Sequence, residues 1–507
     1  MANKKYDAFC SRYIDRFQLK PDKDYSNREV KLHILEAFLD GSIYDNLTAY
    51  YLEYSGGETS GKYIPLAKRR PSVIYPIHKI IVDESVSMLF GEGHFPIVRC
   101  EHEETTNCLD YLTRVSGLKT AVIELARSGS IGSAAFLIRV LDKKFYYEIL
   151  NAKHLFPYFS PLNPTILIRL TESKKYDGAT LQSMGYTIPK DEENYIFCLD
   201  REWDTENETY FLPYQIDTLT REESVKRTKD ENRSFTHGLG FVPILWIQNL
   251  PKTCCIDGES TFESIVDISI EMNYQISQLG RGLKYSSDPT LVIKNPTTLQ
   301  DSQLVKGIGA LTLDEKGDAY LLEMKSAATD AVINYFNLLR QMALEAVRGN
   351  RANPDKLGGL HSGKALQMLN SALISLVEEL RLSYGQNGLL RIYTMMLAIM
   401  ELTDVDTGDC PPKQDFDCAG HLTLSWPDWY APTPQDTLQK AQAIQTLLGS
   451  GTISRKTGIK AVANEFDIND IEEEIKNVEK EQTDAHNEQM QLKTGGTQSG
   501  KVDPNQN

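Results

Sequence analysis

The sequence predicts a protein of mixed α+β class whose parts are arranged around a central run of helices. Three observations predict this class. Short alternating strands dominate the second half of residues 1–257, long amphipathic helices begin at residue 258, and a helix over residues 362–402 exceeds the usual globular length. With 507 residues, 41% of them apolar, the chain is long enough for several domains and a large buried core.

Residues 1–257 are predicted to form a body of helices followed by strands. Apolar spacing of three and four residues predicts helices over 30–39, 77–90 and 109–127, and Gly91 is expected to end the second of them. From residue 134 the spacing changes to the alternation typical of strands. The predicted strands are 135–140, 145–150, 165–170, 195–199, 210–216 and 242–247.

Residues 258–285 predict a single amphipathic helix, about 40 Å long at ~1.5 Å per residue. Its polar face carries four carboxylates: Glu259, Glu263, Asp267 and Glu271. Residues 286–326 predict three short strands, over 290–293, 310–313 and 319–324. A second amphipathic helix is predicted over 327–349. Its apolar side is expected to hold Val332, Tyr335, Phe336, Leu339, Met342 and Val347.

A glycine-rich loop over residues 350–361 connects this helix to the very long one. The loop and its borders concentrate positive charge in Arg348, Arg351, Lys356, His361 and Lys364. Ser362 is the expected N-cap of the long helix, and Gly385 and Gly388 are the expected sites of a bend. The region 362–430 then ends in a strand over 422–426.

The C-terminal part is predicted to be helical and then disordered. After three prolines, residues 431–481 predict helices over 436–448, 456–466 and 468–481. Residues 482–507 are polar and offer little to bury, so we expect them to be disordered.

Composition excludes several classes of protein. The net charge of −16 argues against tight wrapping of DNA, although it allows a protein that DNA slides past. No run of about 18 apolar residues occurs, so no membrane partner is expected. The eight cysteines lack regular spacing and are expected to be reduced thiols.

No pattern of catalytic or metal-binding residues stands out. Residues 56–63 and 358–365 both fit the G-x-x-x-x-G-K spacing of a phosphate-binding loop, but neither has Ser or Thr after its lysine or a buried strand before it. Cysteine and histidine residues do not have the paired spacing of zinc ligands. We therefore expect no enzyme activity, no catalytic residue, no metal and no cofactor.

The charged groups leave two interpretations open. The cationic loop is either an ordinary solvated loop or, if copies of it are arranged in a ring, a contact for a polyanion. The acidic helix face is either a solvated face or the wall of a channel, where carboxylates would repel phosphate and keep DNA from adhering.

The order of these elements resembles that of the bacteriophage portal proteins of siphophage-type heads. The resemblance runs from about residue 31 to residue 481. It includes the helix over 77–90 with Gly91, the segment His237-Gly-Leu-Gly-Phe-Val-Pro, the opening Ser362-Gly-Lys-Ala-Leu-Gln of the long helix, and Leu424-Ser-Trp-Pro-Asp-Trp. The resemblance implies a portal fold: an N-terminal arm and α+β wing (1–257), stem helices (258–285 and 327–349), a small β-rich clip (286–326), a tunnel loop (350–361), a long kinked wing helix with a closing strand (362–430), a helical crown (431–481) and the tail.

The resemblance also implies a function. Portal proteins form a ring, usually of twelve subunits, at one capsid vertex, and double-stranded DNA is packaged and ejected through its axis. The large terminase ATPase would dock on the clip and later be replaced by a head-completion adaptor, while major capsid and scaffolding proteins would contact the wing. The protein would assemble in the host cytoplasm and reside in the virion. The tunnel-loop cations would face DNA.

Two alternatives differ in class from this one. A DNA-packaging ATPase of terminase type would need a strand-preceded phosphate-binding loop and a carboxylate cluster, which the sequence lacks. A scaffolding or adaptor protein without a ring would be expected to show sustained coiled-coil heptads and little β structure, whereas residues 134–249 are rich in predicted strands.

Overall fold

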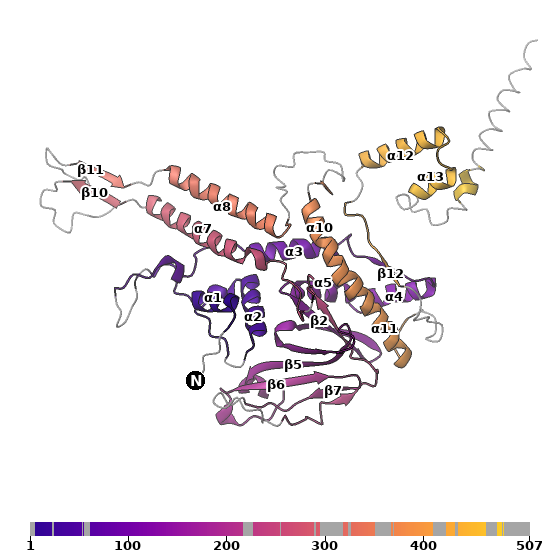
Figure 1. Ribbon diagram of the computed structural model, residues 1–507, viewed down its shortest axis with the longest axis horizontal. Helices are drawn as coiled ribbons and strands as arrows, with labels where there is room; N and C mark the ends of the chain where they lie inside the picture. The colour runs from indigo at the N-terminus through magenta and orange to yellow at the C-terminus, as the bar shows by residue number, and fades with distance from the viewer. Residues whose placement is uncertain are drawn as a thin grey trace, which may run out of the picture. The chain divides into compact units, whose positions relative to one another are not determined.

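The computed structural model describes most of the chain, in two units (Figure 1). The described residues are 6–22, 25–52, 54, 61–215, 227–253, 255–287, 290–294, 318–322, 326–349, 367–368, 370–408, 422–430, 434–462, 474–478 and 480. The first unit comprises Met1–Leu357 with Leu369–Trp429, and the second comprises Gly358–Met368 with Tyr430–Asn507. No described helix has both the length and the hydropathy of a membrane span.

The first unit begins with five helices: α1 (Ala8–Phe17), α2 (Asn27–Asp40), α3 (Ile77–Phe90), α4 (Glu103–Val115) and α5 (Leu118–Gly129). The predicted helices 30–39 and 77–90 are confirmed as α2 and α3. A capping box fixes the start of α2, because Ser26 accepts from the backbone N–H of Glu29 and the Glu29 carboxylate accepts from that of Ser26. Helix α1 was not predicted.

The predicted single helix over 109–127 is wrong, because the structure has two helices there. Helix α4 ends where the Ser116 hydroxyl donates to the Leu112 carbonyl, and Gly117 then adopts φ +73° before α5 begins. Glycine adopts this left-handed conformation without the steric cost that a Cβ brings, so the chain can turn at this position.

Two antiparallel sheets lie beside these helices. The first has the strand order β3–β2–β9, and the second β4–β5–β6–β7–β8. In the first sheet Phe136 of the central strand pairs with Ile149 on one side and Leu245 on the other. The strands are β2 (Ser133–Leu141), β3 (Lys144–Asn151), β4 (Leu155–Phe159), β5 (Leu167–Asp177), β6 (Ile196–Trp203), β7 (Asn207–Tyr210), β8 (Phe235–Thr236) and β9 (Ile244–Gln248).

The predicted strands over 135–140, 145–150 and 242–247 are confirmed as β2, β3 and β9. The predicted strand over 210–216 is wrong in extent. Strand β7 ends at Tyr210, and beyond it Phe211 and Tyr214 form only isolated bridges, to Lys229 and Cys198.

An antiparallel helix pair, with a two-stranded ribbon at its far end, leaves the wing (Figure 1). The helices are α7 (Val266–Ser287) and α8 (Ser326–Ala346), and the ribbon pairs β10 (Thr290–Lys294) with β11 (Asp318–Leu322). The predicted strand over 310–313 lies outside the described residues.

The predicted start of the first stem helix at residue 258 is wrong. A 3₁₀ turn over Glu263–Ile265 precedes α7, and residues 255–262 before it are not helical. The Gly258 N–H donates to the Gly132 carbonyl, and Glu259 forms a β-bridge with Leu250. These backbone bonds tie the segment to the wing, so it cannot form the first helical turn.

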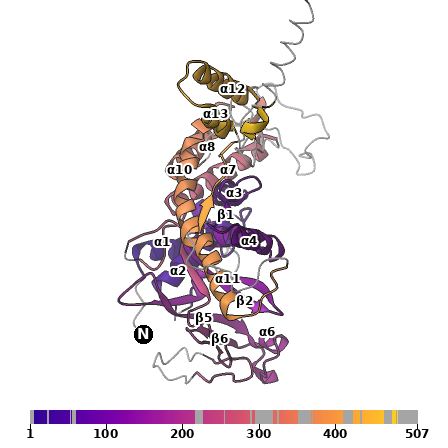
Figure 2. The ribbon, with the colours of Figure 1, turned by 90° about the vertical axis from the view of Figure 1, so that its right-hand side faces the viewer.

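The long wing helix runs as one continuous rod in Figure 2, as α10 (Ser371–Leu380), a π-helical segment η9 (Arg381–Leu389) and α11 (Leu390–Leu402). Gly385 and Gly388, the expected sites of a bend, both lie in the π-helical segment η9, and the bend itself stays a prediction. A Cβ on Gly385 would lie 2.6 Å from the Trp426 ring, so only glycine allows this close approach. The predicted N-cap Ser362 lies outside the described residues.

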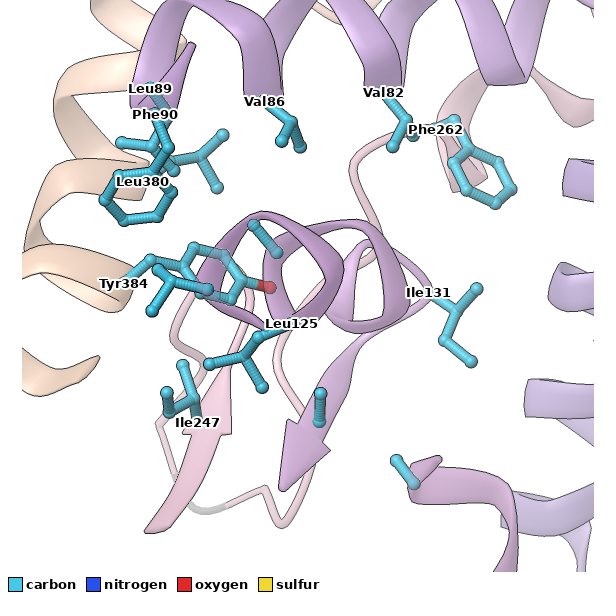
Figure 3. Close-up of a cluster of buried hydrophobic side chains, with 14 of the residues drawn as sticks. Val82, Val86, Leu89, Phe90, Leu125, Ile131, Ile247, Phe262, Leu380 and Tyr384 are labelled. Atoms are coloured by element: carbon cyan, nitrogen blue, oxygen red, sulfur yellow. The ribbon is translucent and has the colours of Figure 1, made fainter. Parts of the chain in front are cut away.

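The core of the first unit lies between α3, α5, the sheet β3–β2–β9 and the wing helix (Figure 3). Phe90, Leu125, Ile247 and Tyr384 are all buried there, each from a different element. The closing strand β12 (Thr423–Ser425) pairs antiparallel with β1 (Ile97–Arg99), which joins the end of the unit to its first half.

The second unit contains α12 (Pro434–Gly449) and α13 (Arg455–Val462). They are joined at Gly451, whose φ is +69°, and a Cβ on Gly458 would lie 3.2 Å from Leu448. The predicted helix over 436–448 is confirmed. Most of 463–481 and all of the tail 482–507 lie outside the described residues.

Candidate functional site

The two helices that border the tunnel loop are tied together by one ion pair. Arg348 follows α8 with a left-handed φ of +56°, and its guanidinium donates to both carboxylate oxygens of Glu379 on α10, at 2.7 and 2.8 Å. The hydrogen bonds from Arg348 lower the pKa of the Glu379 carboxyl, and the same bonds raise the pKa of Arg348. A bidentate pair of this kind fixes direction as well as distance.

Gly349 completes this junction. It is buried, its N–H donates to the Leu344 carbonyl at 2.8 Å, and a Cβ here would lie 3.0 Å from the Leu344 side chain. Of the five predicted tunnel-loop cations, Arg348 is therefore engaged within its own chain. Its contact with DNA stays a prediction. Arg351, Lys356, His361 and Lys364 lie outside the described residues.

Three of the four carboxylates on the predicted acidic channel face have a cation of the same chain as partner. Glu259 pairs with Lys252 at 3.1 Å, Glu263 with Lys31 at 2.7 Å, and Asp267 with Arg12 at 2.6 Å. Glu259 also precedes α7 and so does not lie on the helix. Three of these four carboxylates are therefore not free of a positive partner within the chain, and the repulsion of phosphate by this face stays a prediction.

Asp267 and Glu271 have further partners. The second oxygen of Asp267 accepts from the Tyr13 hydroxyl at 3.0 Å, so two side chains of α1 hold the first turn of α7. Glu271 accepts from Gln275 one turn along the helix, at 2.7 Å. Asp267 thus anchors the N-terminal helix α1 to α7. Its role as a channel wall stays a prediction.

A buried polar network joins the wing helix to the start of the stem. The Asn249 side chain donates to the Glu259 carbonyl and to the Thr261 hydroxyl, both at 2.9 Å, and accepts from the Tyr384 hydroxyl at 3.0 Å. Figure 3 shows Tyr384 reaching from the wing helix toward α5. Burial raises the pKa of Tyr384, so the hydroxyl stays protonated and can donate. Sequence reasoning missed this network because its members are distant in sequence.

The Trp-Pro-Asp-Trp segment holds the outside of the same helix. The Arg381 guanidinium carbon lies 4.4 Å from the centroid of the Trp426 ring and 3.4 Å from that of Trp429. Burial lowers the pKa of Arg381 to about 10, and its Nε and Nη2 atoms have no hydrogen-bond partner among the described residues. The two indole rings therefore stabilise this charge through cation–π contacts, and the carboxylate of Glu378 also favours the charged form.

A cleft with a volume of about 840 Å³ lies where the predicted stem meets the wing. Its cations are each paired with a carboxylate: Arg28 with Asp257, Lys31 with Glu263, Lys252 with Glu259, and Arg348 with Glu379. The described part of the chain holds no cluster of three or more metal-ligating side chains. These ion pairs join α2 and the segment before α7 to their neighbours along the wall of the cleft.

Comparison with protein families assigns the fold. The family model described as "Phage portal protein, SPP1 Gp6-like" matches residues 42–488, which is most of the chain. The chain belongs to this phage portal protein family. Its members are structural proteins and not enzymes, so the alternative of a packaging ATPase is excluded. The portal chain shows the predicted α+β fold.

Two solved structures are similar over much of their length. One is described as "Neck of empty GTA particle computed with C6 symmetry" and the other as "Virion of native gene transfer agent (GTA) particle". The identities are 11% and 12%, and each match has a TM-score of 0.36 and covers 76% of this portal chain and 88% of the other. Because the TM-score is below 0.5, we draw no conclusion about fold or function from these two structures. No curated protein matches the sequence.

Proposed function

We propose that this portal chain assembles into a closed ring at one vertex of a phage capsid, and that double-stranded DNA is packaged and ejected through the axis of the ring. The observation that carries the proposal is the antiparallel pair α7–α8, which ends in the ribbon β10–β11 and projects from the wing of a family member. Helices projecting in this way can line an axis when copies stand side by side.

The clip and the wing bind different partners. The large terminase ATPase docks on the clip, residues 286–326, and a head-completion adaptor takes its place after packaging. Major capsid and scaffolding proteins contact the wing. Assembly takes place in the host cytoplasm, and the finished ring resides in the virion with twelve subunits.

The tunnel loop is the part that contacts DNA. Arg351, Lys356, His361 and Lys364 supply positive charge to phosphate, and contacts of this kind are independent of base sequence. The Arg348–Glu379 pair sets where the loop begins, because it holds the end of α8 against α10.

The test is a deletion of residues 350–359, which spares both Arg348 and Gly349. The variant is expected to form rings of normal mass but to fill few capsids with DNA in a packaging assay, because Arg351 and Lys356 are removed and the loop is shortened while the helix junction is kept. The matched control exchanges the same residues for a Gly-Ser loop with Arg351 and Lys356 retained. Normal packaging by the deletion variant would contradict the role of the loop.

A further inference from the structure

Helix α8 has a second apolar face that the described part of the chain leaves uncovered. Leu339, Ala343 and Val347 form the buried face. At 100° per residue, a further set of apolar residues falls within an arc of about 80° on another side of the helix. This outer stripe consists of Ala331, Tyr335, Leu338, Met342 and Ala346, all of them exposed. The sequence placed Tyr335 and Met342 on one apolar side together with Leu339 and Val347, and in the structure Tyr335 and Met342 are 41% and 47% exposed.

A segment on the other flank of the stem is held tightly against α7. The Tyr50 hydroxyl donates to the Ser277 carbonyl at 2.7 Å, and the Tyr75 N–H donates to Asn273 Oδ1 at 2.8 Å. The Tyr274 hydroxyl in turn bonds the Arg69 carbonyl at 3.0 Å. We call the described residues 44–52, 54 and 61–75 the strap. Its last residue, Tyr75, also contacts α8, where its hydroxyl accepts from Arg340 Nε at 3.2 Å and its ring centroid lies 5.7 Å from that of Phe336. Figure 1 shows α7 lying between most of the strap and most of α8.

The strap presents aromatic side chains to solvent. Tyr54 and Tyr63 pair in an antiparallel bridge with their ring centroids 6.0 Å apart. With Tyr51 and Leu52 they form the tyrosine patch, in which Tyr51 is 79% exposed. Tyrosine combines a large apolar area with a polar end and is enriched in protein interfaces. A patch of this composition on one chain indicates a surface that a partner covers.

We propose that the tyrosine patch of one copy docks on the outer stripe of α8 in the next copy of the ring. This inference rests on the proposed ring. The two surfaces differ and lie on opposite flanks of one helix pair, which is what a head-to-tail contact requires if it is to repeat and close. Each copy then offers its patch to one neighbour and its stripe to the other.

The charges beside the two surfaces also favour a second copy of this chain as the partner of the outer stripe. The strap carries exposed Lys62 and Lys68, and Glu345 borders the outer stripe, so the two surfaces have charges of opposite sign. The stripe itself contains no Lys or Arg, the residues that hold nucleic-acid phosphates. An apolar stripe with an acidic border therefore fits a protein surface with lysines at its edge, and the strap of a second copy supplies one.

The first experiment compares two neighbouring positions of α8 in the full chain. Leu338→Glu places a carboxylate in the outer stripe, whereas Asn337→Glu places it 100° away on the polar side. Native mass spectrometry over a dilution series is expected to show the half-assembly concentration raised at least about tenfold by Leu338→Glu and unchanged by Asn337→Glu. The thermal unfolding of unassembled chains serves as the folding check.

A mixing experiment tests the head-to-tail pairing itself. Tyr51→Glu damages the patch but keeps the stripe, and Leu338→Glu damages the stripe but keeps the patch. One intact interface is available when the two variants are mixed, so equal amounts are expected to form 1:1 heterodimers and no larger species. This result is not expected from misfolded variants, which would remain apart.

The outcomes separate the two proposals. Wild-type protein that forms no ring would contradict the proposed function. Wild-type rings together with normal rings from Leu338→Glu and Tyr51→Glu would overturn only the docking, and would mean that the stripe faces another partner. Larger closed rings from the mixture would likewise overturn it.

Discussion

The contact between Gly129 and Tyr384 gives a sharp test of how the wing helix is positioned. Gly129 ends α5, and a Cβ built on it would lie only 2.1 Å from the Tyr384 hydroxyl oxygen. That hydroxyl is buried and bonded to Asn249, so the ring cannot turn aside without breaking the bond. We predict that Gly129→Ala destabilises the protein.

The size of the effect follows from two opposing terms. Ala is favoured over Gly within a helix by about 0.5–1 kcal/mol. Overpacking of a buried site costs typically about 1–3 kcal/mol. Since the clash involves an atom fixed by a hydrogen bond, we expect the upper part of that range and a net loss of about 1–2 kcal/mol. Tyr384→Phe alone should cost about 1–2 kcal/mol through the lost hydrogen bond.

The double variant separates this contact from a general loss of packing. Phenylalanine at position 384 lacks the oxygen that the new Cβ would strike. Gly129→Ala combined with Tyr384→Phe should therefore be no less stable than Tyr384→Phe alone, and less destabilised than the sum of the single changes by about 1–2 kcal/mol. Urea unfolding at one fixed protein concentration measures all four chains.

Gly280→Ala is the matched control. Gly280 lies within α7, and a Cβ there meets nothing within 4 Å, so the substitution should be neutral or stabilising by up to about 1 kcal/mol. Strict additivity of the Gly129 and Tyr384 changes, or a stabilising Gly129→Ala, would refute the contact as the reason for glycine at position 129.

Two further predictions concern acid. Arg348 lowers the pKa of the Glu379 carboxyl, so the pair stabilises the fold at neutral pH, and this contribution is lost as pH falls through the lowered pKa. Glu379→Gln should therefore cost at most about 1 kcal/mol at pH 7, and the variant should lose less unfolding free energy than the wild type when urea titrations are repeated at acid pH. An unchanged acid profile would count against the pair. Burial lowers the pKa of His78 to about 4, so the fold loses stability as pH falls from about 6.5 toward 4. His78 packs against the rings of Phe38 and Phe262, so a phenylalanine suits this position. His78→Phe should remove on the order of 3 kcal/mol of the stability loss on acidification. Equal acid sensitivity of the variant and the wild type would show that another group dominates.

Local periodicity was sufficient to find the elements whose apolar spacing is regular. Helix α3 and the strands β2, β3 and β9 follow the prediction closely, because each buries a face with the period of its backbone. The break at Gly117 escaped prediction, since apolar residues continue on both sides of it. The pairing of β1 with β12 was missed because β1 has three residues and its partner lies more than 300 positions away.

The candidate site could be predicted only in composition. Charge counts identified the cationic loop and the acidic residues, but they gave no partners, so the pairing of Asp267 with Arg12 and of Arg348 with Glu379 was not foreseen. Spacing placed Tyr335 and Met342 of the outer stripe on one apolar side with Leu339, but it did not show that these two side chains are exposed. Periodicity reports that a face is apolar, whereas only the fold reports what covers it.

The central claim is that the chain forms a ring with an open axis. Negative-stain electron microscopy of the purified full chain, combined with native mass spectrometry, tests this most directly. The account predicts rings with a central hole and a mass that is a whole multiple of the 57.2 kDa chain, with twelve copies expected. A monodisperse monomer or dimer that stays unassembled when scaffolding protein is added would contradict it.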